Sequence, residues 1–334
     1  MTEGRGGTNG GTGNITLDGI ATVLKGATRV AILSHMRPDG DAIGCSLALS
    51  AALDNIGVEN VVCNETGVPS NLAFIDGVDK IVEKPKGEYD VMIALDCADD
   101  QRLGALLESF YIAKNKRIVT VNLDHHVSNT RYAKHNYVRC CAANCMNVAK
   151  LIEYLGAPFD KKTSEYLLLG LLTDSGNFSH DDVDEEAFLL AAKLVKAGAD
   201  IRRLSYHLFK KQSKERAALY ADVMKKMRFY HDDRFALIVI TKEQMDAQNA
   251  DKGMTEGFVD FPLSVDTVEI AAAIMEVKKG QYKISLRSKE YADVNKLAAS
   301  YGGGGHVRAA GCMLFGDLED VLDRLSYTVS QYLE

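Results

Sequence analysis

Three runs of apolar, mostly β-branched residues constrain the fold more than any other feature of the sequence, because each ends in side chains that can bind a metal ion. "RVAILSH" ends at His35, "DVMIALD" ends at Asp96, and "RIVTVNLDHH" ends at Asp124, His125 and His126. Continuous apolar runs of this kind are typical of strands buried on both faces, as in a parallel sheet covered by helices. In such sheets the carboxyl ends of the strands form the ligand-binding edge, so we expect these polar residues to converge there.

Helices are expected between and after these strands. Glycine follows the helical patterns over 41–55 and 143–155, which indicates helix ends and a β-α-β order. The apolar run "YLLLGLL" at 166–172 has a period that does not distinguish helix from strand. Charged helices are expected over 184–229. Beyond residue 235, "FALIVI", "VEIAAAIMEV" and "QYKISLRS" predict a smaller mixed sheet with flanking helices, so the fold class is α/β throughout.

A chain of 334 residues is long enough for two domains, each with its own core. We expect a flexible glycine-rich tail over 1–14, an N-terminal α/β domain over 15–185, a helical linker over 186–232 and a C-terminal domain over 233–334. No apolar stretch approaches the roughly 20 residues that a membrane span needs. The seven cysteines form no CxxC pair and are odd in number, which favours reduced thiols and a cytoplasmic protein. A net charge of −7 argues against binding of long nucleic acids.

The polar residues around the predicted edge suit a metal centre. "SHMRPDGDAIG" adds Asp39 and Asp41 to His35, and Asp174 follows the apolar run that ends at Thr173. Carboxylates and imidazoles together suit Mn²⁺ and also Mg²⁺, Fe²⁺ or Zn²⁺. So many anionic ligands exceed what one ion needs, whereas two divalent ions about 3.5 to 4 Å apart would use them and would suit attack on phosphorus.

The structural alternative is that these residues only support the fold. Taken alone, Asp96 or Asp174 fits a helix N-cap equally well, and a solitary histidine is more often structural than a ligand. Together, the HxxxDxD and DHH motifs are hard to explain in this way, because burying so much like charge without a cation is costly.

A second candidate site lies near the C-terminus, in "GGGGH" at 302–306. A glycine run alone also fits a flexible loop. However, glycines allow backbone N–H groups to approach an anion, and seven Lys or Arg residues against three acids lie between Glu276 and Arg308. Arg287 ends an apolar run there, and a guanidinium suits bidentate phosphate binding.

With these residues in hand, the chain resembles the DHH phosphoesterase superfamily, in its DHH plus DHHA1 branch of the oligoribonuclease and pAp phosphatase type. Four motifs appear in the family's order, and the DHHA1 glycine-histidine signature follows them, so the resemblance covers about 15–334. The motifs are "SHMRPDGDAIG", "ALDCAD", "LDHH" and "GLLTDSGNF". Residues 15–185 then correspond to the catalytic DHH domain and 233–334 to a substrate-binding DHHA1 domain.

The resemblance also implies a role for each site residue. His35 and Asp39 would bind one Mn²⁺, and Asp96 would bridge it to a second ion, with Mg²⁺ or Co²⁺ as substitutes. The ligands of that second ion would be Asp41, His125 and Asp174. The catalytic residues would be His126, which faces the substrate phosphate, and Asp124, which orients the histidines. The substrate-binding residues would be Arg287, Gly303, Gly304, Gly305 and His306.

The implied activity is hydrolysis of short oligoribonucleotides (nanoRNA) and linear dinucleotides such as pApA and pGpG to mononucleotides, and of pAp to AMP, by water that two metal ions activate. The expected protein is cytoplasmic, binds neither membranes nor long nucleic acids, and is compatible with a homodimer. Two alternatives remain open: a pyrophosphatase or exopolyphosphatase, and a non-catalytic nucleotide sensor. Three positions depart from the family pattern: Cys45 stands where serine is usual, "AANCM" where small hydroxyl residues are frequent, and Val307 where proline is frequent.

Overall fold

The computed structural model describes residues 13–115 and 118–333, which form two compact units. The first unit ends at Lys211 and the second begins at Gln212. Among the described residues, no helix combines the length and the apolar character that crossing a bilayer requires.

The first unit is built on a six-stranded sheet in which every neighbouring pair is parallel, in the order β1-β6-β5-β4-β2-β3. The predicted parallel sheet is therefore confirmed. Its strands are β1 (Gly13–Asn14), β2 (Arg29–Ser34), β3 (Glu59–Cys63), β4 (Val91–Leu95), β5 (Val119–Asp124) and β6 (His135–Val138). All three apolar runs identified in the sequence form neighbouring central strands.

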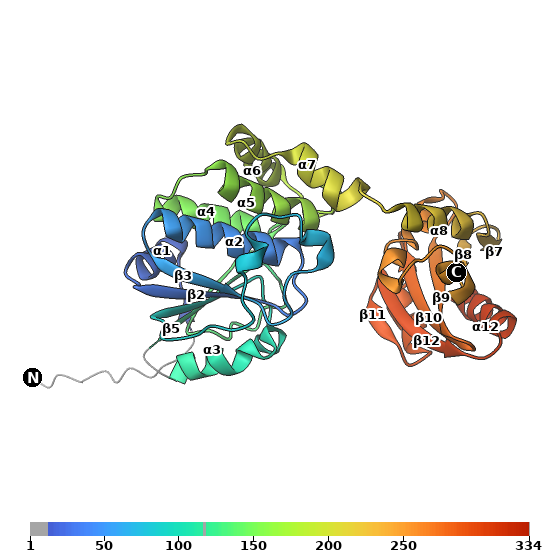
Figure 1. The fold of residues 1–334 in the computed structure, drawn as a ribbon. Coiled ribbons are helices and arrows are strands. Elements are labelled where there is room, and N and C mark those ends of the chain that lie inside the picture. Colours follow the sequence, from blue (N-terminus) through green and yellow to red (C-terminus); the bar gives the residue numbers. More distant parts are fainter. Residues whose placement is uncertain (1–12, 116–117, 334) are drawn as a thin grey trace, which may run out of the picture. The chain divides into compact units, whose positions relative to one another are not determined.

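Helices cover both faces of this sheet, which explains why the central strands are buried along nearly their whole length (Figure 1). Alternate residues of a strand point to opposite faces. In β2, Val30 and Ile32 pack into a core shared with α1, α2, α4 and α5, whereas Ala31 and Leu33 pack into a core shared with α3. The helices are α1 (Leu17–Lys25), α2 (Gly40–Asn55), α3 (Leu106–Asn115), α4 (Asn144–Leu155), α5 (Lys161–Asp174), α6 (Glu185–Lys196) and α7 (Ile201–Ser205).

The segment whose period was ambiguous is a helix. "YLLLGLL" lies in α5, which begins after Asp160, whose side chain accepts a hydrogen bond from Thr163 N at 2.7 Å. Every residue from Tyr166 to Leu172 is buried. A helix that is buried all round has no polar face, so its sequence carries no helical period.

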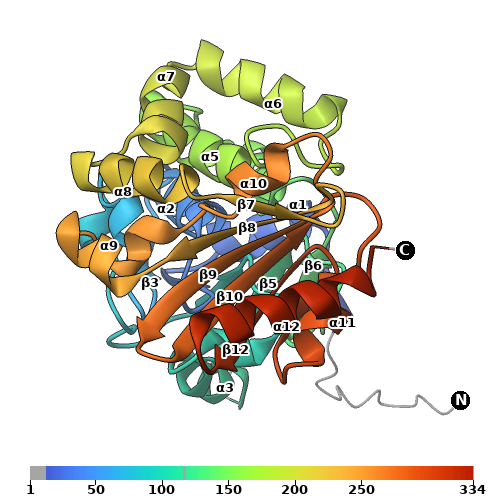
Figure 2. The same ribbon diagram turned by 90° about the vertical axis from the view of Figure 1, so that its right-hand side faces the viewer.

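The second unit is a mixed six-stranded sheet in the order β11-β12-β10-β9-β8-β7, in which only β8 and β9 pair in parallel (Figure 2). The predicted smaller mixed sheet is therefore confirmed. Its strands are β7 (Arg228–Tyr230), β8 (Phe235–Ile240), β9 (Ile270–Lys278), β10 (Gln281–Ser288), β11 (Gly304–His306) and β12 (Ala309–Phe315). Its helices are α8 (Lys214–Met224), α9 (Lys242–Ala247), α10 (Asp260–Ser264), α11 (Val294–Ala299) and α12 (Leu318–Ser330).

At two of the predicted domain boundaries, the structure shows details that the sequence did not indicate. The predicted tail lies outside the described residues up to residue 12, but Gly13 and Asn14 form β1, because Gly13 N donates to Lys134 O at 2.9 Å and so joins the sheet. The helices of the predicted linker divide between the units. Leu204 of α7 is buried in a core of the first unit, whereas Leu219 of α8 is buried in a core of the second.

Candidate metal centre

The carboxyl ends of three neighbouring strands supply the centre of the site. His35 follows β2, Asp96 follows β4, and Asp124 ends β5 just before His125 and His126. Because β5, β4 and β2 are adjacent and parallel, these residues meet at one edge of the sheet.

Two helices bring the remaining carboxylates to the same edge. Asp39 is the N-cap of α2 and Asp41 lies in its first turn, whereas Asp174 is the last residue of α5. The helices cross so closely that a Cβ on Gly170 would overlap Asp41 Oδ1 and lie 3.1 Å from Asp41 Cα. Glycine at this position therefore lets the start of α2 and the end of α5 lie side by side.

The potential ligand atoms fall into groups whose members lie within 4.8 Å of one another. One group joins His35, Asp39 and Asp96, and another joins Asp41, His125 and Asp174. These groups bring together the residues expected to hold each ion, and a third group joins Asp96 to Asp124, His125 and His126. Asp96 lies between them, because its Oδ2 is 3.6 Å from His35 Nε2 and its Oδ1 is 3.3 Å from His125 Nε2.

Backbone carbonyls fix the orientation of both histidines. His35 Nδ1 lies 3.0 Å from Met36 O, and His125 Nδ1 lies 2.8 Å from Cys141 O. A carbonyl oxygen can only accept, so each Nδ1 carries the proton and, in the neutral imidazole, each Nε2 presents its lone pair. Those lone pairs point at the oxygens of Asp96. Two acceptors facing each other repel, so this geometry requires a proton or a metal cation between them.

Asp96 is unusual in its backbone and in its side chain. Its φ is 54°, in the left-handed region that residues other than glycine seldom adopt. Its side chain is 3% exposed, yet Oδ1 makes no hydrogen bond among the described residues. The N-cap alternative is therefore wrong for Asp96, since Asp99 caps the short 3₁₀ helix that follows, and it is wrong for Asp174, which ends its helix.

Asp41 is held by the start of another helix. Its Oδ1 accepts hydrogen bonds from Cys145 N at 3.0 Å and Cys45 Sγ at 3.2 Å, and its Oδ2 accepts one from Asn144 N. The N-cap residue of α4, Ala143, has no side chain that could serve these N–H groups. Asp41 therefore caps α4 from outside, and the helix dipole stabilises its negative charge.

The pocket holds an excess of negative charge. Burial raises the pKa of Asp174 to about 7, with the charge of Asp96 adding to the shift, and burial also raises the pKa of Asp41 well above its ordinary value. Burial lowers the pKa of His35 and His125, but the neighbouring carboxylates outweigh it and raise each pKa to about 10. For Asp96, burial opposes ionisation, but the two histidines hold its pKa below the ordinary range. A divalent cation would neutralise this charge in place of protons.

His126 and Asp124 form a separate pair beside these groups. His126 Nδ1 lies 2.9 Å from Asp124 Oδ1, and the hydrogen bond to Asp124 raises the pKa of His126. Asp124 is fully buried and also accepts from Asn129 Nδ2 at 2.6 Å. Asp124 thus orients His126 as the resemblance implied, whereas the carbonyl of Cys141 orients His125 instead.

Several residues that support the site carry no sequence motif. Asn129 fixes Asp124, the backbone of Asn144 and Cys145 holds Asp41, and the carbonyls of Met36 and Cys141 orient the histidines. Every residue type can supply these backbone groups, so the contacts that they make cannot be recognised from the sequence. Asn129 is the exception, since an asparagine three residues after DHH is visible in the sequence and was overlooked.

The predicted substrate residues gather on the sheet of the second unit. In the antiparallel register Arg287 lies opposite Ala309, and Ala309 lies opposite His306. Directly opposed residues point to the same face, so Arg287 and His306 occupy one row with Ala309 between them. Arg287 also lines a pocket of about 540 Å³ with Lys252 and Lys283.

The glycine run is more ordered than a flexible loop. Gly304–His306 form strand β11, which pairs with β12. A Cβ on Gly303 would overlap the carbonyl of Gly311, so the close approach of these strands requires glycine there. Gly305 N donates to Asn295 Oδ1 at 2.8 Å, which removes one N–H group from the anion nest that the sequence suggested.

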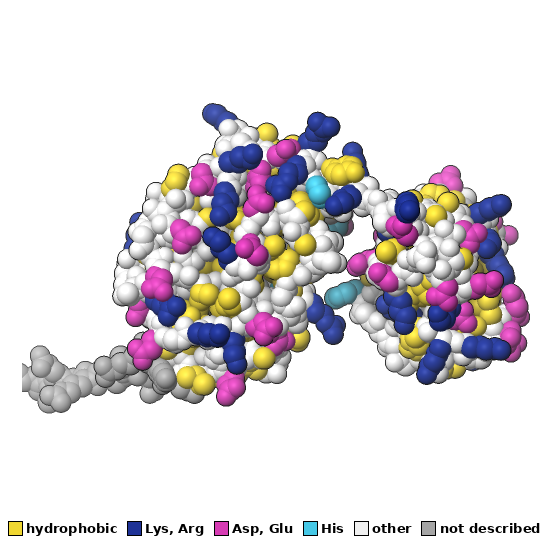
Figure 3. Space-filling view, viewed as in Figure 1, with side chains coloured by type: hydrophobic (Ala, Val, Ile, Leu, Met, Phe, Trp, Pro, Cys, Tyr) yellow, Lys and Arg dark blue, Asp and Glu magenta, His cyan; other side chains and the backbone are white. Residues whose placement is uncertain are grey.

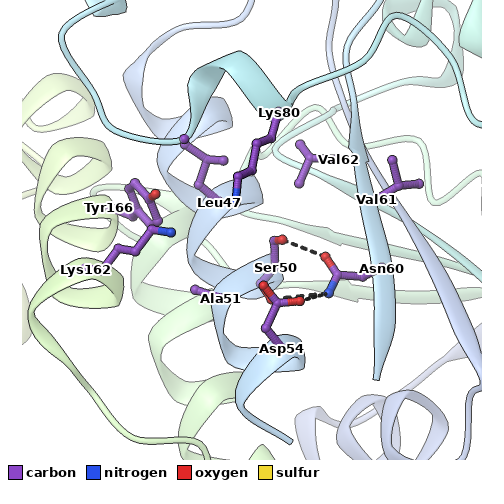
Figure 4. Close-up of a pocket in the computed structure, with 11 residues that line it drawn as sticks. Leu47, Ser50, Ala51, Asp54, Asn60, Val61, Val62, Lys80, Lys162 and Tyr166 are labelled. Carbon is purple, nitrogen blue, oxygen red and sulfur yellow. Dashed lines mark hydrogen bonds between the residues drawn. The ribbon is translucent and has the colours of Figure 1, made fainter. Parts of the chain in front are cut away.

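A different pocket lies beside α2, β3 and α5 in the first unit (Figure 4). Three of its polar side chains are hydrogen-bonded to one another: Ser50 Oγ donates to Asn60 Oδ1 at 2.6 Å, and Asn60 Nδ2 donates to Asp54 Oδ1 at 2.8 Å. None of the clustered aspartates and histidines lines this pocket, so it is not part of the candidate metal centre.

Comparisons with known proteins agree with this geometry. The model of the DHH family, N-terminal domain, matches residues 29–171, and the DHHA1 domain model matches residues 235–334. The bifunctional oligoribonuclease and PAP phosphatase NrnA of Thermus thermophilus is 31% identical over 326 residues, which cover 94% of this chain and 93% of that protein. A probable NrnA of Streptococcus mutans is 25% identical over 310 residues, covering 92% and 96%.

A solved structure is similar over nearly the whole chain. It is described as an exopolyphosphatase-related protein from Bacteroides fragilis, and it superposes with a TM-score of 0.82 at 27% identity, covering 95% of this chain and 96% of that one.

Proposed function

The chain belongs to the DHH family and carries a DHHA1 domain, and on that premise we propose that it is a metal-dependent phosphoesterase that hydrolyses short oligoribonucleotides and linear dinucleotides to mononucleotides and pAp to AMP. The relatives named NrnA, which are similar over most of both chains, support this choice of substrates. The net charge of −7 supports short rather than long nucleic acids, because long ones need an extended basic surface.

One observation supports the proposal most directly. A backbone carbonyl fixes each of two histidines through Nδ1, and the two Nε2 atoms face different oxygens of the buried Asp96. A purely structural role would not need a left-handed backbone at Asp96 or a buried carboxylate oxygen without a hydrogen bond among the described residues. The donor set fits a pair of divalent cations, and its mixture of imidazole and carboxylate favours Mn²⁺, with Mg²⁺ or Co²⁺ as substitutes.

We assign the ligands by the groups described above. His35, Asp39 and Asp96 would hold one ion, and Asp41, His125 and Asp174, with Asp96 shared, would hold the other. Bound there, the ions would supply the Lewis acid that activates water and neutralises charge on the phosphoryl oxygens. Asp41 keeps its position because α4 donates to both of its oxygens, and the backbone carbonyls prevent the imidazole rings from turning.

His126 has a different role in this proposal. Its Nδ1–H donates to Asp124, and its side chain is 33% exposed, so Nε2 is available to the substrate. Because Asp124 favours the protonated imidazole, His126 donates a hydrogen bond to a phosphoryl oxygen and stabilises the charge that develops there. In the second unit, Arg287 and His306 bind the nucleotide, and the glycines at 303 and 305 let the chain lie close to β12, which places His306 in the row with Arg287.

The Bacteroides fragilis protein favours a second candidate, hydrolysis of pyrophosphate or polyphosphate at the same metal centre. Such a substrate has no nucleoside and would not need His306, whereas its phosphates would still pair with Arg287. Substitution of His306 would then leave turnover unchanged, whereas a nucleotide substrate would show a raised KM.

The test incubates the purified protein and Mn²⁺ with pAp, pApA, pGpG, 5-mer and 24-mer RNA, pyrophosphate and polyphosphate, and resolves the products by chromatography. We expect mononucleotides from the dinucleotides and the 5-mer, AMP from pAp, and little product from the 24-mer. Faster turnover of pyrophosphate or polyphosphate than of every nucleotide would favour the second candidate. Nucleotide binding without any turnover in Mn²⁺ would identify a sensor.

A further inference from the structure

The most basic part of the first unit is its last segment, residues 201–211. Its sequence "IRRLSYHLFKK" contains Arg202, Arg203, Lys210 and Lys211 and no acidic residue, in a chain whose net charge is −7. Tyr206, His207 and Phe209 lie between the two pairs of cations. Such a combination of charge and aromatic rings is typical of surfaces that bind single-stranded nucleic acids.

The segment is well anchored although much of it is exposed. Leu204 is buried in the core, and the ring of His207 stacks on Phe74 with centroids 4.2 Å apart. Arg203 donates to Glu165 Oε2 at 3.2 Å and to Phe74 O at 2.8 Å. Arg203 is therefore engaged in holding the segment to the unit and is not available to a ligand.

A π-helical turn presents the aromatic rings. Helix α7 continues into a π-helix over Tyr206–Lys210, which Lys211 N closes by donating to Tyr206 O at 2.7 Å. Tyr206 is 53% exposed and Phe209 is 44% exposed. π-Helical turns are rare and are frequently found at functional sites.

These side chains line a surface pocket of about 500 Å³. Its lining includes Arg202, Tyr206, His207 and Lys210, and Figure 3 shows blue, yellow and cyan side chains gathered in the region of α7. The acidic member of the lining, Asp200, caps α7 by accepting from Arg203 N at 2.9 Å. A pocket of this size accommodates one nucleotide.

We propose that this pocket is a second RNA subsite, which binds a nucleotide of an oligoribonucleotide other than the one being released. Arg202 and Lys210 pair with its phosphate, and its base stacks on Tyr206. The inference rests on the proposed function and deepens it, because such a subsite would serve a 5-mer and would not serve pAp. The exposed aromatic ring favours RNA over an acidic peptide, since a base offers a stacking partner and a carboxylate does not.

The test measures fluorescence anisotropy of a labelled 5-mer RNA with the full-length protein in EDTA, where no turnover occurs. We expect the R202A/K210A variant to raise the Kd about tenfold and to lower the salt-dependence slope by roughly 1 to 2, as expected for loss of two phosphate contacts. Loss of stacking in Y206A should raise the Kd about fivefold or more. The K25A/K196A variant loses two exposed lysines of the same unit and should bind like the wild type.

Turnover in Mn²⁺ gives an independent readout. For R202A/K210A we expect a raised KM for the 5-mer, with pAp hydrolysis within twofold of the wild type. An unchanged Kd for the 5-mer, an equal loss in K25A/K196A, or an equal fall in pAp hydrolysis would overturn the subsite. The subsite would also be overturned if a polyglutamate peptide bound through Arg202 and Lys210 while the R202A/K210A substitutions left RNA binding unaffected. If the wild type hydrolyses nothing, the proposed function fails, and the anisotropy still reports on the subsite.

Discussion

Asp96 is the residue on which both ligand groups depend. Each of its oxygens faces one histidine Nε2, so replacing one oxygen by an amide removes a ligand from the bridge. For Asp96→Asn we expect hydrolysis to fall at least about a thousandfold and Mn²⁺ binding to weaken by roughly 10-fold or more. Calorimetric titration with Mn²⁺ and turnover of pApA measure the two effects.

The control for this variant is Asp182→Asn, which neutralises an exposed carboxylate of the same unit. It should behave like the wild type in both assays. Circular dichroism should show that both variants are folded, which is checked because Asp96→Asn also removes a buried charge that faces His35 and His125. Full turnover by folded Asp96→Asn in chelator-treated buffer would contradict the metal centre.

Substitution of His126 distinguishes a role in catalysis from a role in metal binding. If its role is to donate to the substrate, His126→Ala should lower kcat by about 10²- to 10⁴-fold and change the Kd for Mn²⁺ little. Asp124→Asn should reproduce part of the loss, because it weakens the hydrogen bond that orients the imidazole. A Kd for Mn²⁺ that rises in parallel with the loss of kcat would instead make His126 a ligand, as its 3.7 Å distance to Asp96 allows.

At the scale of elements, the crossing of α2 and α5 determines whether the carboxylates converge. Gly170→Ala forces its new methyl group against Asp41, so we expect a loss of about 1 to 3 kcal/mol in the free energy of unfolding together with weaker Mn²⁺ binding. Chemical denaturation and calorimetric titration measure the two effects. In the control Gly26→Ala, the nearest atom to the new Cβ is 3.5 Å away, so neither quantity should change by much.

The sequence allowed the strands and the ligand types to be predicted, because a parallel sheet imposes both an apolar run and a common edge. His35 and Asp96 could be proposed as ligands from that pattern alone, whereas the choice of His125 rather than His126 came from the family resemblance. The helical state of α5 could not be predicted, because complete burial removes the helical period from its sequence. The carbonyls that orient the histidines could not be predicted either, since any residue type supplies a carbonyl at those positions.

At the scale of the whole molecule, the two units have separate cores. The hydrophobic clusters of the described residues belong either to the first unit or to the second, and none joins the two. A cation that binds only the first unit should therefore stabilise that unit alone. At a concentration of Mn²⁺ about 100 times its Kd, the expected gain is about 2.7 kcal/mol.

Hydrogen exchange with mass spectrometry measures this effect along the full chain. Added Mn²⁺ should slow exchange in β2, β4 and β5 and leave β8, β9 and β10 unchanged. The same experiment with Asp96→Asn at the same Mn²⁺ concentration should show a smaller gain, because the variant binds the ion more weakly. Equal slowing in both units with Mn²⁺ alone would mean that the ion is not confined to the edge described here.

The row that contains Arg287 and His306 depends on a strand of only three residues, and this makes it sensitive to chain length. Successive residues of a strand face opposite sides of the sheet, so adding or deleting one glycine before His306 would turn its ring to the reverse side without disturbing β12. Substitution of Gly303 or Gly305 would push a new Cβ against the backbone of β12, whereas a change in the number of glycines would take His306 out of the row that it shares with Arg287.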